Sequence, residues 1–174
     1  RSRVRRYGLI MTDTHQTSSG SLTSLWERPG HLIRRLHQIH VAIFLEECSA
    51  YGITPVQYAV MTALLNTPGA DQVTIARDAG IDRTNVADVL ARLAQRGLVI
   101  REAGTRDRRM RVARLTAEGD RISREMEHAS LSAQARLMAP LSAEKRDLLM
   151  ALMGELVEAN NEFSRAPARS RAPG

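Results

Sequence analysis

Cysteine is almost absent from this 174-residue sequence, in which Cys48 is the only one. An internal disulfide is therefore impossible, and a reducing cytoplasm is the expected location. Apolar runs are short, and none approaches the ~18–20 residues that a membrane-spanning helix requires. The N-terminus is basic, but no apolar segment of a signal peptide follows it. These absences predict a cytoplasmic protein without a membrane partner.

Lysine and aromatic residues are also scarce. Lys145 is the single lysine, and aromatic residues make up 3% of the chain. The two terminal segments hold seven arginines, one more than the formal net charge of +6: Arg1, Arg3, Arg5, Arg6, Arg165, Arg169 and Arg171. Residues 82–116 carry nine arginines against four acidic residues, so the rest of the chain between the terminal segments is acidic. One basic patch on an acidic protein indicates a polyanionic partner.

Motifs of enzymes and metal sites are missing. The sequence contains no glycine-rich phosphate loop, no His-Glu-x-x-His pair and no recognisable nucleophile motif. His37 and His40 could face the same ion, but no convincing set of cysteine, histidine and carboxylate ligands surrounds them. We therefore expect a protein that is not an enzyme and holds no cofactor and no metal.

Helical patterns occupy both ends of the chain. Four apolar residues follow Pro29 at helical spacing, and we expect them to form a buried stripe: Leu32, Leu36, Ile39 and Ile43. Two further helices with apolar stripes are predicted from Thr116 to Pro140 and after Leu141. These end helices have no large core of their own to join. Packing against a second copy, as a two-fold homodimer, is the economical solution.

A helix–turn–helix is predicted in the centre of the chain. Thr54-Pro55-Val56-Gln57 combines an N-cap Thr, a Pro at the first helical position and a Gln three residues after the cap. This capping box predicts a helix that ends near Asn66. Two shorter helices are expected, one at residues 72–78 and one from the N-cap Asp82 to Gly97.

Short β-type runs follow at residues 98–100 and 110–115, and they predict a two-stranded hairpin. A helix–turn–helix followed by such a hairpin is a winged helix. The expected fold class is mostly α with a small β-hairpin wing, a winged helix-turn-helix domain between terminal dimerisation helices. The expected divisions are a flexible tail (1–24), an N-terminal dimerisation helix (25–52), a DNA-binding lobe (53–116), C-terminal dimerisation helices (117–164) and a disordered tail (165–174).

The helix after Asp82 has a polar face suited to reading DNA. Four residues define its buried side by their spacing: Val86, Val89, Leu90 and Leu93. The opposite side carries Thr84, Asn85, Asp88, Ala91 and Arg92. Short polar side chains and an Arg can reach base edges in a major groove. The alternative is an ordinary solvated helix face.

An arginine-rich segment follows at residues 104–116. It holds five arginines in nine positions: Arg106, Arg108, Arg109, Arg111 and Arg114. At a loop tip these charges would repel one another unless they faced a polyanion. An Arg held out from a β-loop can enter a narrow minor groove while its neighbours bind phosphates. Together with the polar helix face, this segment predicts a DNA-binding unit.

Residues 53–119 resemble the MarR family of winged-helix regulators. The matching segments are Thr54–Tyr58, Asp82–Val86, Leu93–Val99, Asp107–Arg109 and Leu115–Gly119. The most specific match is the Asp-x-Arg motif of the wing. Its Asp107 lies nine positions before Thr116, the Thr of the Leu-Thr-x-x-Gly helix start. The resemblance implies a homodimer on a pseudo-palindromic double-stranded DNA operator, with Arg109 in the minor groove and Asp107 orienting it. The DNA-contacting residues we expect are Arg83, Thr84, Asn85, Asp88, Arg92, Arg106, Asp107, Arg108, Arg109 and Arg111.

The resemblance also implies a small-molecule effector. Family members commonly repress a promoter and release it when a ligand, often an aromatic acid, binds between the DNA-binding lobe and the dimer helices. Residues 28–40 are similar to the branch that controls aromatic-acid catabolism, in which some members sense the CoA thioester, for example a hydroxycinnamoyl- or benzoyl-type CoA. Cationic groups on this helix could bind a carboxylate or CoA phosphates. The expected ligand residues are Trp26, His31, Arg34, Arg35, His37, His40 and Tyr58.

Several alternatives remain open from the sequence. Arg34 and Arg35 could lie on a solvated face or form intersubunit ion pairs, and Trp26 and Tyr58 could be ordinary packing residues. Cys48 could sense oxidation, although neighbouring carboxylates should raise its thiol pKa. The function alternatives are a redox- or metal-responsive regulator of the same family and a nonspecific basic architectural protein that coats nucleic acid. The polar and partly acidic helix face favours sequence-specific binding over such a coat.

Overall fold

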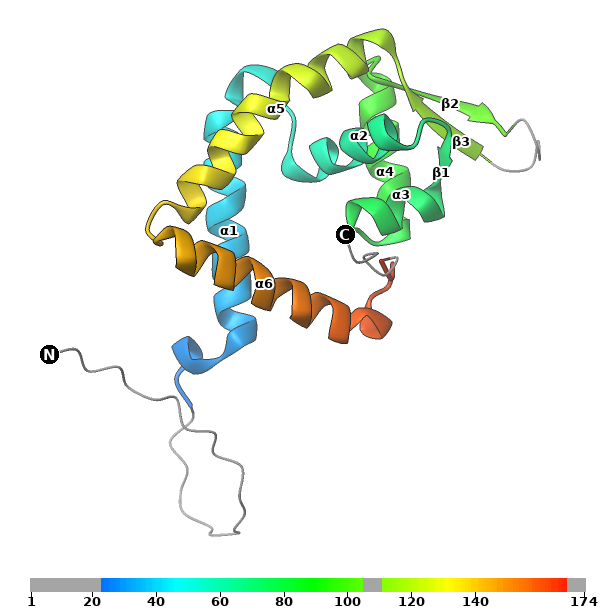
Figure 1. Ribbon diagram of the computed structural model, residues 1–174. Helices are drawn as coiled ribbons and strands as arrows, with labels where there is room; N and C mark the ends of the chain where they lie inside the picture. Colours follow the sequence, from blue (N-terminus) through cyan, green and yellow to red (C-terminus); the bar gives the residue numbers. More distant parts are fainter. Residues whose placement is uncertain (1–22, 105–110, 169–174) are drawn as a thin grey trace, which may run out of the picture.

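The computed structural model describes residues 23–104 and 111–168. Its architecture is mostly helical with a small antiparallel sheet, which confirms the predicted fold class (Figure 1). The helices are α1 (Pro29–Glu47), α2 (Pro55–Asn66), α3 (Gln72–Ala79), α4 (Arg83–Gln95), α5 (Ala117–Met138) and α6 (Ala143–Ala159). Short 3₁₀ turns lie at η1 (Leu25–Glu27), η2 (Ser49–Tyr51) and η3 (Asn161–Phe163). The strands are β1 (Ala70–Asp71), β2 (Val99–Ala103) and β3 (Arg111–Leu115).

The caps predicted from the sequence begin the central helices. Thr54 and Gln57 form the capping box of α2: Gln57 N donates to Thr54 Oγ1 at 3.3 Å, and Thr54 N donates to Gln57 Oε1 at 3.0 Å. Asp71 caps α3 by accepting from Thr74 N at 2.8 Å, and Asp82 caps α4. These bonds satisfy backbone N–H groups that have no partner within a helix. They explain why the helices begin where the sequence predicts.

The sheet has three strands rather than the predicted two. Its order is β1-β3-β2, with Ala70 opposite Ala113 and Arg101 opposite Ala113 on the other side. Gly69 bends the chain into β1 with φ +81 and donates from its N to Ala113 O at 3.0 Å. A two-residue strand has no alternation of its own. The sequence pattern therefore gave no sign of β1.

The core joins the central helices to α5. Met126 and Ala133 of α5 are fully buried, as the α5 apolar stripe predicts. α1 also packs along α5, and the residues at its C-terminal end that are buried in the core are Phe44 and the C-cap Cys48. Of the predicted stripe, Ile43 packs against this core, whereas Leu32, Leu36 and Ile39 are 39–51% exposed in the single chain. Periodicity locates the most apolar face of α1, but the face that carries Phe44 is the one buried in the single chain.

α6 is not covered by the rest of the described chain. In the view of Figure 1 it overlaps α1 and extends below the central helices. None of its residues is buried, and three leucines of its predicted stripe are 48–61% exposed: Leu148, Leu152 and Leu156. None of the described helices is both long and apolar enough to cross a membrane. The apolar faces of α1 and α6 thus have no partner within the described chain.

Candidate DNA-binding surface and effector pocket

The polar side of α4 is exposed as predicted. Val86, Leu90 and Leu93 are buried at 0–1% exposure and fix the rotation of the helix. The predicted contact residues on α4 all lie on its exposed side: Arg83, Thr84, Asn85, Asp88 and Arg92. A helix held by its apolar stripe in this way presents short polar side chains on a rigid backbone. That arrangement is suited to a groove of DNA.

Asp82 organises the N-terminus of α4. Its Oδ1 accepts hydrogen bonds from Thr84 N at 3.1 Å and Thr84 Oγ1 at 3.0 Å. Arg165, from the end of the described chain, donates from Nη1 to Asp82 Oδ2 at 2.9 Å. Arg165 and the Thr84 hydrogen bonds lower the pKa of the Asp82 carboxyl to about 2. Asp82 is therefore ionised at any physiological pH.

The wing contributes one described member of the predicted DNA surface. Arg111 is exposed at the first position of β3, opposite Ala103 of β2. The wing-tip residues Arg106, Asp107, Arg108 and Arg109 lie outside the described residues. Arg114 lies further along β3, where its Nε is 3.7 Å from Glu102 Oε2, and its guanidinium covers Gly69.

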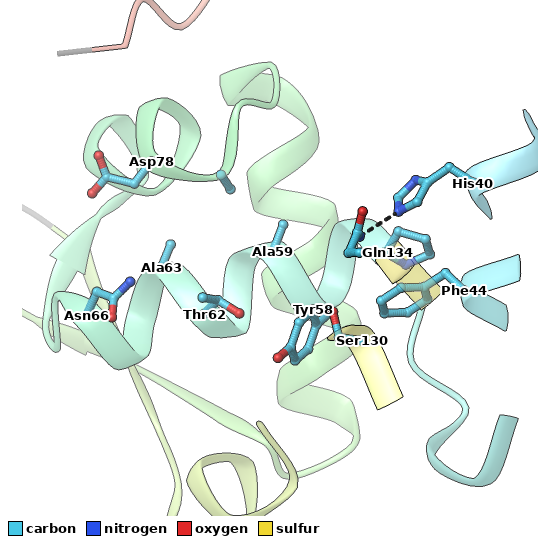
Figure 2. Close-up of a pocket in the computed structure, with 12 residues that line it drawn as sticks. His40, Phe44, Tyr58, Ala59, Thr62, Ala63, Asn66, Asp78, Ser130 and Gln134 are labelled. Carbon is cyan, nitrogen blue, oxygen red and sulfur yellow. Dashed lines mark hydrogen bonds between the residues drawn. The ribbon is translucent and has the colours of Figure 1, made fainter. Parts of the chain in front are cut away.

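A pocket of about 430 Å³ opens where α1 and α5 meet α2 and α3. Figure 2 shows His40 and Phe44 of α1 and Gln134 of α5 at one end, and Asp78 of α3 at the other. α2 runs between these ends. The pocket is lined by His40, Phe44, Pro55, Tyr58, Ala59, Thr62, Ala63, Asn66, Asp78, Ala79, Ser130 and Gln134. Helices expected in the dimer and in the DNA-binding lobe therefore share one cavity.

The pocket combines aromatic walls with neutral polar groups. The rings of Phe44 and Tyr58 lie 5.8 Å apart at 45°. His40 Nε2 is 3.3 Å from the Gln134 amide nitrogen, which donates to it when the neutral imidazole carries its proton on Nδ1. Burial and then the charge of His37 lower the pKa of His40, which favours that neutral form. Burial raises the pKa of the Tyr58 phenol, so it stays a hydrogen-bond donor.

Thr62 and Asp78 complete the polar lining. Thr62 Oγ1 is buried beside the Tyr58 side chain. Asp78 accepts from Arg77 Nε at 2.8 Å. None of the lining residues is Lys or Arg.

Two of the predicted ligand residues, His40 and Tyr58, line this pocket, and five do not. The others lie toward the N-terminal end of α1: Trp26, His31, Arg34, Arg35 and His37. There Trp26 packs edge-on against His31 at 5.4 Å between ring centroids, and Arg35 Cζ lies 6.0 Å from the Trp26 ring centre. The sequence analysis did not predict that Phe44, Thr62, Ser130 and Gln134 line the pocket, because no local motif links residues from different helices.

Arg34 and His37 nevertheless share a face of α1 with the pocket wall. Arg34, His37, Val41, Phe44 and Cys48 recur at three- and four-residue spacing along the helix. Phe44 and Cys48 are buried against the rest of the chain, and the N-terminal members continue this face beyond the pocket. Arg35 lies outside this series.

Cys48 is placed as a packing residue. Its side chain is 1% exposed, and burial followed by the charge of Glu47 raises the pKa of the thiol. Both effects disfavour the reactive thiolate. Within residues 23–104 and 111–168, no group of three or more His, Cys, Asp or Glu side chains is placed to hold a metal ion.

Comparison with known proteins gives the family. Residues 53–110 match the MarR family. Transcriptional regulator HosA of Escherichia coli O127:H6 is 35% identical over 127 residues, which cover 73% of this chain and 93% of HosA. The PcaV transcriptional regulator of Streptomyces coelicolor, solved with its natural ligand, is 34% identical with a TM-score of 0.73, covering 80% of this chain and 99% of PcaV.

A third relative is BpsR of Bordetella bronchiseptica, whose DNA binding is regulated by 6-hydroxynicotinic acid. It is 27% identical with a TM-score of 0.73, and the match covers 78% of this chain and 97% of BpsR. The relatives are regulators rather than enzymes, and their similarity extends over nearly their whole length. The chain therefore belongs to the MarR family of DNA-binding transcriptional regulators.

Proposed function

We propose that the protein is a repressor that binds a pseudo-palindromic operator as a homodimer and is released by an aromatic acid or its CoA thioester. The observation that carries this proposal is the pocket shared by α1, α2, α3 and α5. A ligand in it contacts both the expected dimer helices and the helices that support α4. Such a ligand can change the affinity for DNA only as far as it binds more tightly to one arrangement of the lobe and the dimer helices than to the other.

The homodimer is supported by the uncovered apolar faces of α1 and α6. Exposed leucines, isoleucines and methionines of these helices would bury a continuous apolar area against a second copy. Two copies of α4 must then lie ~34 Å apart to enter successive major grooves on one side of the DNA. A ligand that tilts one lobe against the dimer helices changes this spacing.

Sequence-specific binding is tested by titration against a duplex selected from random sequence and a scrambled duplex. The proposal predicts ~10³-fold or greater preference for the selected duplex at physiological salt. Asn85→Ala should lower affinity for the selected duplex about ten-fold, because one base contact contributes ~1–3 kcal/mol, and should leave scrambled binding nearly unchanged. Gln95→Ala, an exposed position at the end of α4, is the matched control. Equal affinities for both duplexes would favour the architectural alternative.

The pocket supports an aromatic effector with a polar substituent. Phe44 and Tyr58 can pack against the edge or face of a ligand ring, while the side chains of Gln134 and His40 can hydrogen-bond a hydroxyl or ring nitrogen. A carboxylate needs a cation that the lining lacks. Arg34 lies six residues before His40, a rise of ~9 Å along α1. We assign it the carboxylate, because it continues the face of α1 that carries Phe44.

Arg34→Ala is expected to weaken effector binding ~10-fold or more, because a charge-assisted hydrogen bond to the carboxylate is lost. Arg35→Ala is the matched control, since Arg35 lies beside Trp26 rather than in the Arg34 series. The measurement is a thermal-shift titration with benzoate, hydroxycinnamates and 6-hydroxynicotinate, each beside its CoA thioester. Stabilisation that Arg34→Ala lowers and Arg35→Ala retains supports the assignment. Stabilisation by thioesters alone, lost in Arg35→Ala, would instead assign the Trp26 end of α1 to CoA phosphates.

A further inference from the structure

The C-terminal segment returns to the N-terminus of the recognition helix α4. Figure 1 shows the chain after α6 and η3 lying beside the ends of α3 and α4. Ala166 packs against the buried core, and the side chain of Asn161 makes two 2.8 Å hydrogen bonds with the backbone of Ala168. These contacts fix the segment that carries Arg165. Arg165 then pairs with Asp82 at 2.9 Å.

From this arrangement we infer that Arg165 is a further DNA-contacting residue, which binds a backbone phosphate beside the N-terminus of α4. The inference rests on the proposed placement of α4 in the major groove. The guanidinium makes one hydrogen bond among the described residues, and its side chain is 85% exposed. Its remaining N–H groups face solvent next to the residues that we expect to read bases, Arg83 to Asn85.

The charges around α4 explain why an outside cation is needed. On its exposed side Arg83 and Arg92 are balanced by Asp82 and Asp88, so this surface carries no net positive charge. Asp82 stabilises the N-terminus of α4 as its cap, yet its carboxylate repels an approaching phosphate. Arg165 neutralises that carboxylate and presents the rest of its planar fork of donors outward. The carboxylate, in turn, limits the directions that the guanidinium can take.

The test is the salt dependence of DNA binding by Arg165→Gln. Loss of one phosphate contact per chain should weaken binding ~5-fold and lower the slope of log K against log salt by ~1 per chain bound. Arg165→Lys keeps the charge and should retain most of the slope. Arg28→Gln makes the same charge change at the N-cap of α1, far from α4, and should behave as the wild type. Because Arg165 is so exposed, none of these variants is expected to lose the fold.

The outcomes separate this inference from the proposed repressor function. Arg165→Gln should weaken binding to the selected and scrambled duplexes by the same factor, because a phosphate contact carries no sequence information. If the protein bound DNA without sequence preference, Arg165→Gln should still weaken its binding to both duplexes. An unchanged slope for Arg165→Gln would overturn the inference while preserving the preference for the selected duplex. An equal loss in Arg28→Gln or in Arg165→Lys would also overturn it, because the effect would then follow net charge or a purely structural contact.

Discussion

Gly119→Ala is expected to lower the free energy of unfolding by ~3 kcal/mol or more, the upper range for overpacking in a tightly packed region. A Cβ built at Gly119 would lie 2.1 Å from the carbonyl oxygen of Leu98. That oxygen is backbone and accepts a hydrogen bond from Thr116 N at 3.0 Å, so it cannot move without breaking the junction. The Thr116 hydroxyl ties the same turn together by donating to Gly97 O at 2.7 Å. The Leu-Thr-x-x-Gly pattern thus needs its glycine for close approach of α5 to the loop before β2.

Urea denaturation followed by circular dichroism measures this loss. Gly30→Ala is the matched control, because Gly30 is also helical but has no atom within 4 Å of its built Cβ. It should be neutral or stabilising by up to ~1 kcal/mol, since alanine favours helix more than glycine does. Equal effects of the two substitutions would mean that α5 and the Leu98 loop are not held together as tightly as the distance indicates. Operator binding by Gly119→Ala should fall with the folded fraction.

Local chemistry made the central helices predictable. The start of α2 follows from the capping box of Thr54 and Gln57, whose bonds need only residues three apart. The start and the rotation of α4 follow from Asp82 and from the spacing of the buried residues around Leu90. In these places the sequence signal and the tertiary packing agree. The exposure of the polar side chains of α4 was predictable for the same reason.

Long-range relations were not predictable. β1 is too short for a pattern and depends on its register with Ala113. The pocket brings together Phe44, Thr62, Asp78 and Gln134, which are separated by a dozen or more residues along the chain. The residues expected to bind a ligand include His40 and Tyr58, which line the pocket, but also Trp26, which does not. A cationic and aromatic helix surface carries no information about where the cavity lies.

α1 illustrates a different limit. Its apolar stripe through Leu36 and its inward face through Phe44 are both real features of one helix, and periodicity selected only the more apolar one. Phe44 is buried within its own chain, whereas His37 and Arg34, on the same face, are exposed. Most of the more apolar face is exposed, and in the proposed homodimer a second copy would cover it. Within the single chain, therefore, the less apolar face of α1 is the more buried one, which is the reverse of what hydrophobicity alone predicts.

Replacing Leu152 and Leu156 by Asp is expected to convert the protein to a monomer and to weaken operator binding at least ~100-fold. Both leucines belong to the uncovered stripe of α6, at 48% and 61% exposure. In the proposed dimer each Asp would bury an unpaired carboxylate, which costs several kcal/mol. The second half-site would then no longer benefit from the high effective concentration that a dimer provides. Sedimentation velocity and operator titration measure the two effects.

Ala151→Asp is the control, because it adds a carboxylate to the same helix on the side that carries Asp147 and Glu155. It should remain a dimer and bind the operator normally. Since no residue of α6 is buried in its own chain, the Leu152→Asp/Leu156→Asp variant should keep the fold of the central helices. Its affinity for a duplex with one half-site should match that of the wild type. A variant that stays dimeric, or a monomer that binds the full operator as tightly as the wild type, would contradict the role proposed for α6.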